Sequence, residues 1–277
     1  MLKSILVHVD QSCHAPARIR YAASLAHARG ARLVGAAMLG VSRVIFPLGY
    51  DDRPGTLSAS YFEPLAESAR HALSRFESIA AEMQVPCDAR FVCDQADDAL
   101  ARLARFADLV VISQDDLAES LPDRSAQLPE YLILNCARPV LVVPRADPHP
   151  FANHKVLLAW DGSKEASCAT SAAIPLLRWA AGVTVVTMAR PGISEADCRA
   201  EQQELVNFLS LHRVAADTLV RGPERDTGHA LLTLAGELGC NLLVMGCFGH
   251  SKFRELCLGG ASRTVLADAD IPVLLAH

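Results

Sequence analysis

The sequence predicts an α/β protein with two domains, each an open, doubly wound parallel sheet. Short runs of Val, Leu and Ile alternate along the chain with segments of helical periodicity. These runs lack polar alternation, which is typical of parallel strands covered by helices on both faces. The same order of segments occurs twice within 277 residues. A repeat of that length corresponds to a whole domain.

Five apolar runs in the first half predict strands, near residues 4–9, 32–38, 88–93, 108–113 and 139–143. Helical spacing of apolar residues predicts the intervening helices, near residues 15–29, 63–83, 95–106 and 126–136. In the first helix, Ile19, Ala22 and Ala26 fall on one face, and Gly30 follows as its stop.

The second half repeats this order. Strands are expected near residues 155–160, 183–188, 215–220, 242–246 and 272–276, and helices near 165–180, 194–211, 226–238 and 260–269. Right-handed crossovers between parallel strands then give an open doubly wound sheet in each half. We expect domains at 1–145 and 154–277, joined by a semi-rigid linker with three prolines.

Composition excludes several classes of protein. The net charge is −5 and no stretch is rich in Lys or Arg, which argues against a nucleic-acid-binding protein. Nine cysteines without a Cys-x-x-Cys pair indicate reduced thiols in a cytoplasmic protein. We expect no signal peptide and no membrane span. A phosphate-binding P-loop, a dinucleotide fingerprint after the first strand and a Gly-x-Ser-x-Gly elbow are all missing from the sequence.

A glycine-punctuated segment, residues 246–262, follows the fourth strand of the second half. Ligands of open α/β sheets bind outside the carboxyl ends of strands. Gly246, Gly249 and Gly259 would let backbone N–H groups approach an anion, and the first turn of the next helix would add unpaired donors. The segment therefore predicts an anion site. The alternative is that its glycines only form a tight strand-to-helix connection.

The spacing Gly246-x-x-Gly249, nine residues, then Gly259 resembles the nucleotide loop of the universal stress protein family. The turn Asp161-Gly-Ser163 after a first strand agrees with that resemblance, as does a final Pro-Val-Leu-Leu strand. Both halves share the layout, so the whole chain is similar to a tandem universal stress protein. The resemblance implies two Rossmann-like domains, each with a five-stranded parallel sheet of order 3-2-1-4-5.

Some members of that family bind ATP and others do not. Carried over to this sequence, the resemblance implies a nucleotide site made by Asp161, Thr187, Met188, Gly246, Gly249, His250, Gly259, Gly260, Ala261 and Ser262. Asp161 would lie by the adenosine, and the backbone at Thr187 and Met188 would meet the adenine. ATP-binding members usually carry Ser or Thr directly after the third glycine, where this chain has Gly260. Ser262 or Thr264 could supply that hydroxyl.

The first half has lost this loop. By an offset of 133 positions, the four loop glycines of the second half correspond to Ser113, Asp116, Ala126 and Gln127. Asp115 and Asp116 place negative charge where phosphates would lie, and like charges repel. We therefore predict that the first half binds no nucleotide there. Asp10, which ends the first strand, is expected to be structural.

Four other side chains have two readings each. His8, inside the first strand, is expected to be a satisfied core histidine rather than a ligand. His250 could contact a phosphate or lie at the surface. Cys247 and Cys257 flank the loop, where burial is favoured over redox sensing. Separately, Asp226 is expected to cap the helix that follows it.

Two functional hypotheses follow. The first is a stress-response regulatory protein that binds ATP or a related adenine nucleotide in the second domain, with Mg²⁺ as a potential companion and without efficient turnover. The second is a nucleotide-free interaction or small-ligand-binding stress protein, in which the long insertion at 40–62 covers a cleft or is a surface loop. An enzyme of the adenine-nucleotide α-hydrolase type is a weaker third option. No catalytic residue or metal site is assigned.

The expected partners are an adenine nucleotide and a protein that the sequence does not identify. We also expect the two halves to associate as an intramolecular pseudo-dimer through their final strands, 139–143 and 272–276. A homodimer of the whole chain is a further option.

Overall fold

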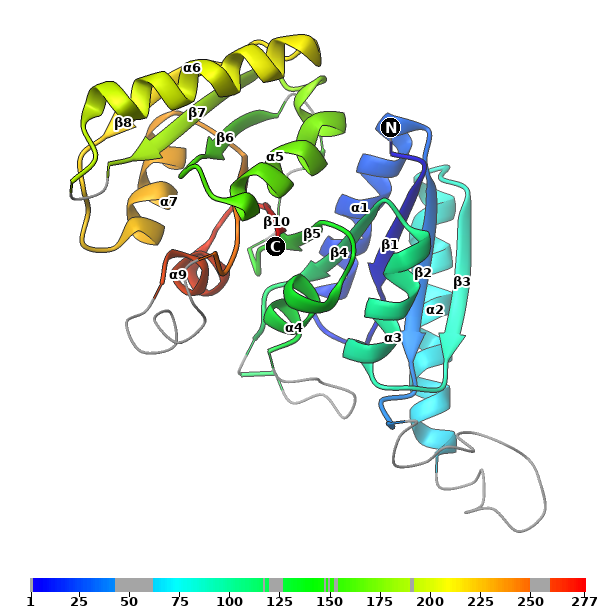
Figure 1. Ribbon diagram of the computed structural model, residues 1–277. Coiled ribbons are helices and arrows are strands. Elements are labelled where there is room, and N and C mark those ends of the chain that lie inside the picture. The colour runs from blue at the N-terminus through cyan, green and yellow to red at the C-terminus, as the bar shows by residue number, and fades with distance from the viewer. Residues whose placement is uncertain are drawn as a thin grey trace. The chain divides into compact units, whose positions relative to one another are not determined.

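The computed structural model describes residues 2–42, 62–116, 118–119, 127–146, 148, 150–151, 154–189, 192–249 and 260–277. The chain divides into two units, Met1–Phe151 and Ala152–His277. Each unit is a parallel sheet with helices on both faces (Figure 1). Most of the long insertion predicted at 40–62 lies outside the described residues.

The first unit alternates strands and helices from its start. Its elements are β1 (Ser4–His8), α1 (Ala15–Arg29), β2 (Arg32–Met38), α2 (Glu63–Glu82), β3 (Cys87–Val92), α3 (Ala96–Leu103), a 3₁₀ turn (Ala104–Phe106), β4 (Leu109–Ser113), α4 (Leu128–Asn135) and β5 (Val140–Val143). The strands follow one another in the order β3-β2-β1-β4-β5. Central β1 pairs in parallel with β2 and β4. This is the predicted order 3-2-1-4-5.

The second unit repeats the arrangement. Its elements are β6 (Lys155–Ala159), α5 (Lys164–Leu177), β7 (Gly182–Met188), α6 (Glu195–Leu211), β8 (Asp217–Arg221), α7 (Thr227–Glu237), β9 (Leu242–Gly246), α9 (Ala261–Asp268) and β10 (Val273–Ala276). The order β10-β9-β6-β7-β8 is again 3-2-1-4-5 within the unit. The α/β class and the strand order predicted for both halves are thus confirmed.

Local chemistry explains most of the element boundaries. Gly30 ends α1 in the left-handed conformation at φ +56°, as predicted for a glycine stop. The helix predicted to reach residue 180 ends at Leu177 instead. There the N–H groups of Trp179 and Ala180 bond the carbonyls three residues earlier, which tightens the last turn.

The cores consist of the apolar runs and the small helix faces that cover them. Ile5 and Val7 of β1 are fully buried, as are Ile19 and Ala22 on the predicted inner face of α1. In each unit two neighbouring strands end at the same edge of the sheet: β1 and β4 in the first unit, β6 and β9 in the second. The polar residues that follow these strands lie at that edge. None of the helices in the described part of the chain is long and apolar enough to cross a membrane.

Candidate functional site

A tight turn after β6 positions Asp161. The Ser163 N–H donates to Asp161 Oδ1 at 3.0 Å, and Gly162 adopts φ +75°, which favours glycine. Ser163 in turn caps α5, because its Oγ accepts the N–H of Ala166 at 3.1 Å. The Asp161 carboxylate is thus held at the carboxyl end of the sheet and remains partly exposed.

The first two loop glycines lie against the start of α5. A Cβ built on Gly246 would lie 2.4 Å from the Ala166 nitrogen, so only glycine lets the end of β9 come this close to the helix. A Cβ on Gly249 would lie 2.6 Å from Glu165 Oε2. Gly246 therefore has a packing reason of its own, as the alternative interpretation of the loop anticipated.

Glu165 is a site residue that the sequence analysis missed. Its side chain lies in the first turn of α5 and is only 3% exposed. Lys164 Nζ is 3.3 Å from Glu165 Oε1, but the lysine side chain is 80% exposed. An acidic residue in a first helical turn is common and gives no signal of a site. Only the fold shows that this carboxylate adjoins Gly249.

The start of α9 differs from the other helix starts of the second unit. Ser163, Ser194 and Asp226 cap α5, α6 and α7 with side-chain oxygens, and the Asp226 cap is as predicted. Gly260 precedes α9 in an extended conformation and offers no such oxygen. Within the described ranges, the first amides of α9 therefore have no side-chain acceptor, which leaves them available to an anion.

The hydroxyls of Ser262 and Thr264, the two proposed substitutes, both already form hydrogen bonds. Ser262 is buried, and its Oγ accepts the N–H of Phe248 at 3.3 Å, which ties the loop to α9. Thr264 Oγ1 donates to Asp226 Oδ2 at 3.2 Å. Cys247 is buried, as favoured from the sequence. His250, Gly259 and Cys257 lie outside the described residues.

Thr187 and Met188 form the carboxyl end of β7, where the adenine is expected. The Thr187 side chain is buried, and its Oγ1 accepts from Gln202 Nε2 at 3.0 Å. Gln202 Nε2 also donates to the Leu219 carbonyl at 2.8 Å. The Thr187 hydroxyl is thus engaged inside the unit. What this position can offer a ligand is its backbone and the half-buried side chain of Met188.

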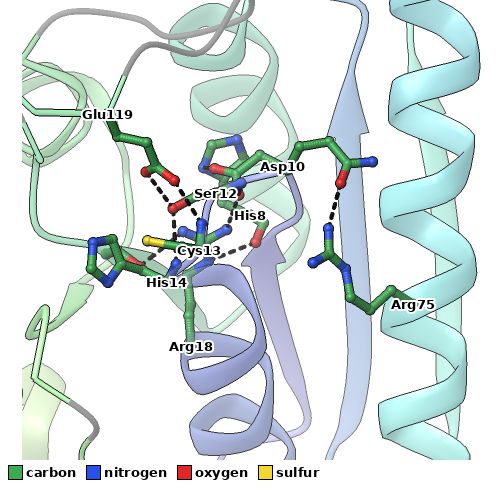
Figure 2. A network of polar contacts seen from close by, with 10 residues as sticks. His8, Asp10, Ser12, Cys13, His14, Arg18, Arg75 and Glu119 are labelled. Carbon is green, nitrogen blue, oxygen red and sulfur yellow. Dashed lines mark hydrogen bonds and ion pairs between the residues drawn. The ribbon is translucent and has the colours of Figure 1, made fainter.

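At the carboxyl ends of β1 and β4 in the first unit, a buried arginine lies beside Asp10 (Figure 2). Arg18 of α1 is 2% exposed, and its Nε donates to the His8 carbonyl at 2.8 Å. Its two terminal nitrogens donate to Asp10 Oδ1 at 2.8 Å and Ser113 Oγ at 2.9 Å. Counted from the first-strand aspartates Asp10 and Asp161, Arg18 stands where the second unit has Ala169. Asp10 therefore has the structural role predicted for it.

Little space remains beside this arginine. A cavity of about 10 Å³ lies over Asp10 between β2 and α2, lined by Met38, Leu39 and Ala69 among others. That volume holds about one water molecule.

The acidic residues after β4 act as internal anions. Asp115 Oδ2 accepts the N–H of Gln127, the residue before α4, at 3.1 Å. Asp116 Oδ2 lies 2.9 Å from His14 Nε2. Glu119 accepts the Cys13 N–H at 2.6 Å and the Ser12 hydroxyl at 2.7 Å. These carboxylates thus accept hydrogen bonds from the segment before α1 and from the residue before α4, and the absence of a nucleotide site in the first unit stays a prediction.

Burial controls the ionisation of the central pair. Removal from water lowers the pKa of His8 to about 4, with Asp10 opposing and Arg18 reinforcing the effect. The pKa of Asp10 is also lowered. Burial is the largest single influence and opposes this, but it is outweighed by the charges of Arg18 and His8 together with the hydrogen bonds from Arg18 and Ser12. His8 is buried as predicted, with Nδ1 3.4 Å from Asp10 Oδ2. It is not fully satisfied, because its Nε2 has no hydrogen-bond partner among the described residues.

Comparison with known proteins shows what the second unit and the fold are similar to. The model of the universal stress protein family matches residues 152–277. A universal stress protein from Archaeoglobus fulgidus aligns with 99% of this chain and 95% of its own, at 15% identity and a TM-score of 0.73. A protein of unknown function from Pseudomonas aeruginosa aligns with 99% of this chain and 92% of its own, at 15% identity and a TM-score of 0.61. At such identities these two likenesses show the fold. The comparison with curated proteins gave no match.

Proposed function

Since the model of the universal stress protein family matches the second unit, we propose that this unit binds ATP or a related adenine nucleotide. The protein then acts as a cytoplasmic stress-response regulator without efficient turnover. The observation that carries the proposal is the start of α9, which has no side-chain cap among the described residues and follows the two loop glycines Gly246 and Gly249. Free backbone donors at a helix start bind phosphate, whereas the neighbouring helix starts already have side-chain acceptors.

In this arrangement the phosphates contact the loop and the first amides of α9. Asp161 accepts from the ribose, and the backbone at Thr187 and Met188 meets the adenine. Nucleotide binding would bias a surface that a partner protein recognises.

Glu165 favours the second candidate function, a nucleotide-free interaction or small-ligand-binding protein. Its buried carboxylate adjoins Gly249 and already supplies a negative charge beside the proposed phosphate position. Mg²⁺ carried by a nucleotide would find an oxygen ligand in this carboxylate, because Mg²⁺ prefers carboxylate and phosphate oxygens. Under the second candidate function the Glu165 carboxylate repels the phosphates of ATP. Under the first it accepts the Mg²⁺ that accompanies them.

The first test identifies the ligand directly. Freshly purified protein is denatured, and the released small molecules are identified by mass spectrometry. We expect an adenine nucleotide at a level near one per chain. A different small molecule, or none together with no heat of ATP binding by calorimetry, would support the nucleotide-free alternative.

Gly249→Asp should weaken ATP binding by about 10- to 100-fold. The new carboxylate lies beside the phosphates, and unit charges ~4 Å apart repel by about 4 kcal/mol at an effective dielectric of 20, reduced here by salt. The matched control is Gly236→Asp on α7, which adds the same charge where a Cβ has open space. Equal ATP affinity in the wild type and Gly249→Asp, by calorimetry, would remove the loop from the proposal.

Glu165→Gln should tighten ATP binding by about tenfold in the presence of EDTA. The substitution removes a negative charge beside the phosphates, and tenfold corresponds to a repulsion energy of about 1.4 kcal/mol. With excess Mg²⁺ the gain should shrink, since the cation then screens the carboxylate. Lys164→Gln controls for the loss of the adjacent exposed charge. An unchanged affinity in EDTA would show that the phosphates lie elsewhere.

A further inference from the structure

A mixed cluster of metal-ligand side chains lies at the carboxyl edge of the first unit. The Cys13 sulfur, one ring nitrogen of His14 and one carboxylate oxygen of Glu119 all lie within 4.8 Å of one another. Cys13 and His14 immediately precede α1, whereas Glu119 comes from the segment after β4. Figure 2 shows the three side chains converging from these two segments. The fold thus brings together residues more than a hundred positions apart.

The spacing of the three atoms is close to what a tetrahedral ion requires. Zinc binds sulfur at about 2.3 Å and nitrogen or oxygen at about 2.0–2.2 Å, so tetrahedral ligand atoms lie roughly 3.4–3.6 Å apart. The three side chains must therefore draw together by no more than about 1.4 Å from their present spread of 4.8 Å. Cys13 is exposed and Glu119 is only half-buried, so rotation about their χ angles can supply this movement.

Hydrogen bonds already order the cluster. The Cys13 N–H and the Ser12 hydroxyl both donate to Glu119, which fixes the carboxylate over the start of α1. His14 Nε2 lies 2.9 Å from Asp116 Oδ2. A carboxylate on one ring nitrogen is the usual partner of a metal-binding histidine, because it sets the tautomer and leaves the other nitrogen to the metal.

We propose that Cys13, His14 and Glu119 form a zinc site in the first unit, with a water as fourth ligand and Asp116 orienting His14. One sulfur, one imidazole nitrogen and one carboxylate oxygen match zinc rather than Ca²⁺ or Mg²⁺, which take oxygen ligands. On binding, the Cys13 thiol loses its proton to solvent and the thiolate bonds the ion.

Charge in the neighbourhood supports a cation. Glu119 and Asp116 bring two carboxylates to the cluster, while the buried Arg18 is bonded to Asp10 instead. The second unit provides an internal contrast, because Lys164 and Glu165 stand where the first unit has Cys13 and His14. The ion would tie the start of α1 to the segment after β4. The first unit would thus bind a cation at the edge that corresponds to the proposed phosphate site of the second unit.

The test uses the full-length protein stripped of metal with a chelator and then titrated with Zn²⁺ or Co²⁺. We expect one tight Zn²⁺ per chain and, with Co²⁺, a thiolate-to-cobalt charge-transfer band together with the visible bands of tetrahedral coordination. Asp116→Asn should weaken Zn²⁺ binding by about 10- to 100-fold. Cys13→Ala and Glu119→Gln should weaken it further. Cys13→Ala should also abolish the charge-transfer band.

Two control variants separate this site from other binding. Cys168→Ser removes an exposed cysteine of the second unit and should leave Zn²⁺ affinity unchanged. Gly249→Asp should also leave it unchanged, since the zinc site does not depend on the nucleotide loop. The far-ultraviolet circular dichroism of each variant checks that it is folded. Undiminished Zn²⁺ affinity in folded Cys13→Ala or Glu119→Gln, or a Co²⁺ spectrum without the thiolate band, would overturn the proposal.

Discussion

Arg18→Met is expected to lower the free energy of unfolding of the first unit by about 3–5 kcal/mol, because removing one partner of a buried ion pair leaves the other charge uncompensated. Asp10 would keep only the Ser12 N–H at 3.1 Å among the bonds that the structure shows for its Oδ1. The Ser113 hydroxyl and the His8 carbonyl would lose their donor as well. The methionine fills the volume of the arginine stem, so the loss reports the polar contacts rather than a cavity.

The two units can be followed separately in this measurement. Both tryptophans of the chain, Trp160 and Trp179, belong to the second unit. Urea unfolding of Arg18→Met should therefore move the first-unit part of the far-ultraviolet dichroism transition and leave the tryptophan fluorescence transition in place. Arg199→Met is the matched control. It breaks an exposed pair with Glu195 and should cost less than about 0.5 kcal/mol.

A double variant tests the reason for the loss. In Arg18→Met with Asp10→Asn no charge remains to be compensated, and part of the lost stability should return. If Arg18→Met unfolds at the same urea concentration as the wild type, the buried pair contributes nothing net to the first unit.

The fold could be predicted almost completely because its signals are local. Continuous apolar runs mark the strands, Gly30 marks the end of α1, and Asp226 marks the start of α7. These features depend on backbone conformation and on which residues exclude water, and both are encoded over a few positions. The departures, such as the end of α5 at Leu177, are shifts of a few residues in the last turn of an element.

The contacts of the site could not be predicted to the same degree. Arg18 sits in an ordinary helical pattern, and its burial depends on Asp10 and Ser113, two segments that only the fold brings together. Position-by-position comparison of the two halves gives one indication of this difference, because Arg18 corresponds to Ala169. Glu165 was missed for a similar reason. Its closeness to Gly249 is a tertiary contact, and an acid in a first helical turn is unremarkable.

Asp115 and Asp116 have a structural role that their charge alone does not predict. The sequence predicts that they repel phosphates at this edge. The structure adds that they bond the amide of Gln127 and the ring of His14. In the first unit these carboxylates thus serve as internal hydrogen-bond acceptors at the carboxyl edge of the sheet.

Acid should destabilise the first unit through His8. Burial lowers the pKa of this imidazole to about 4, whereas it is about 6.5 in the unfolded chain. Between these values the unfolded state binds a proton that the folded state excludes, so stability falls as the pH falls from about 6.5 to 4. The shift corresponds to a loss of about 3 kcal/mol across that window.

The contribution of Asp10 falls in a different window. Its pKa is lowered on folding, so its stabilisation is present above the unfolded value of 3.8 and is lost only as the pH falls below it. Glu119, whose pKa is lowered from 4.5 on folding, also contributes only below that value, so urea unfolding followed by far-ultraviolet dichroism between pH 7 and about 5 should isolate His8. His8→Leu keeps an apolar side chain where Nε2 has no partner among the described residues, and it should flatten the profile in this range. An equally steep decline in His8→Leu would mean that another group takes up the proton, and that the buried imidazole is not what makes this edge of the first unit sensitive to acid.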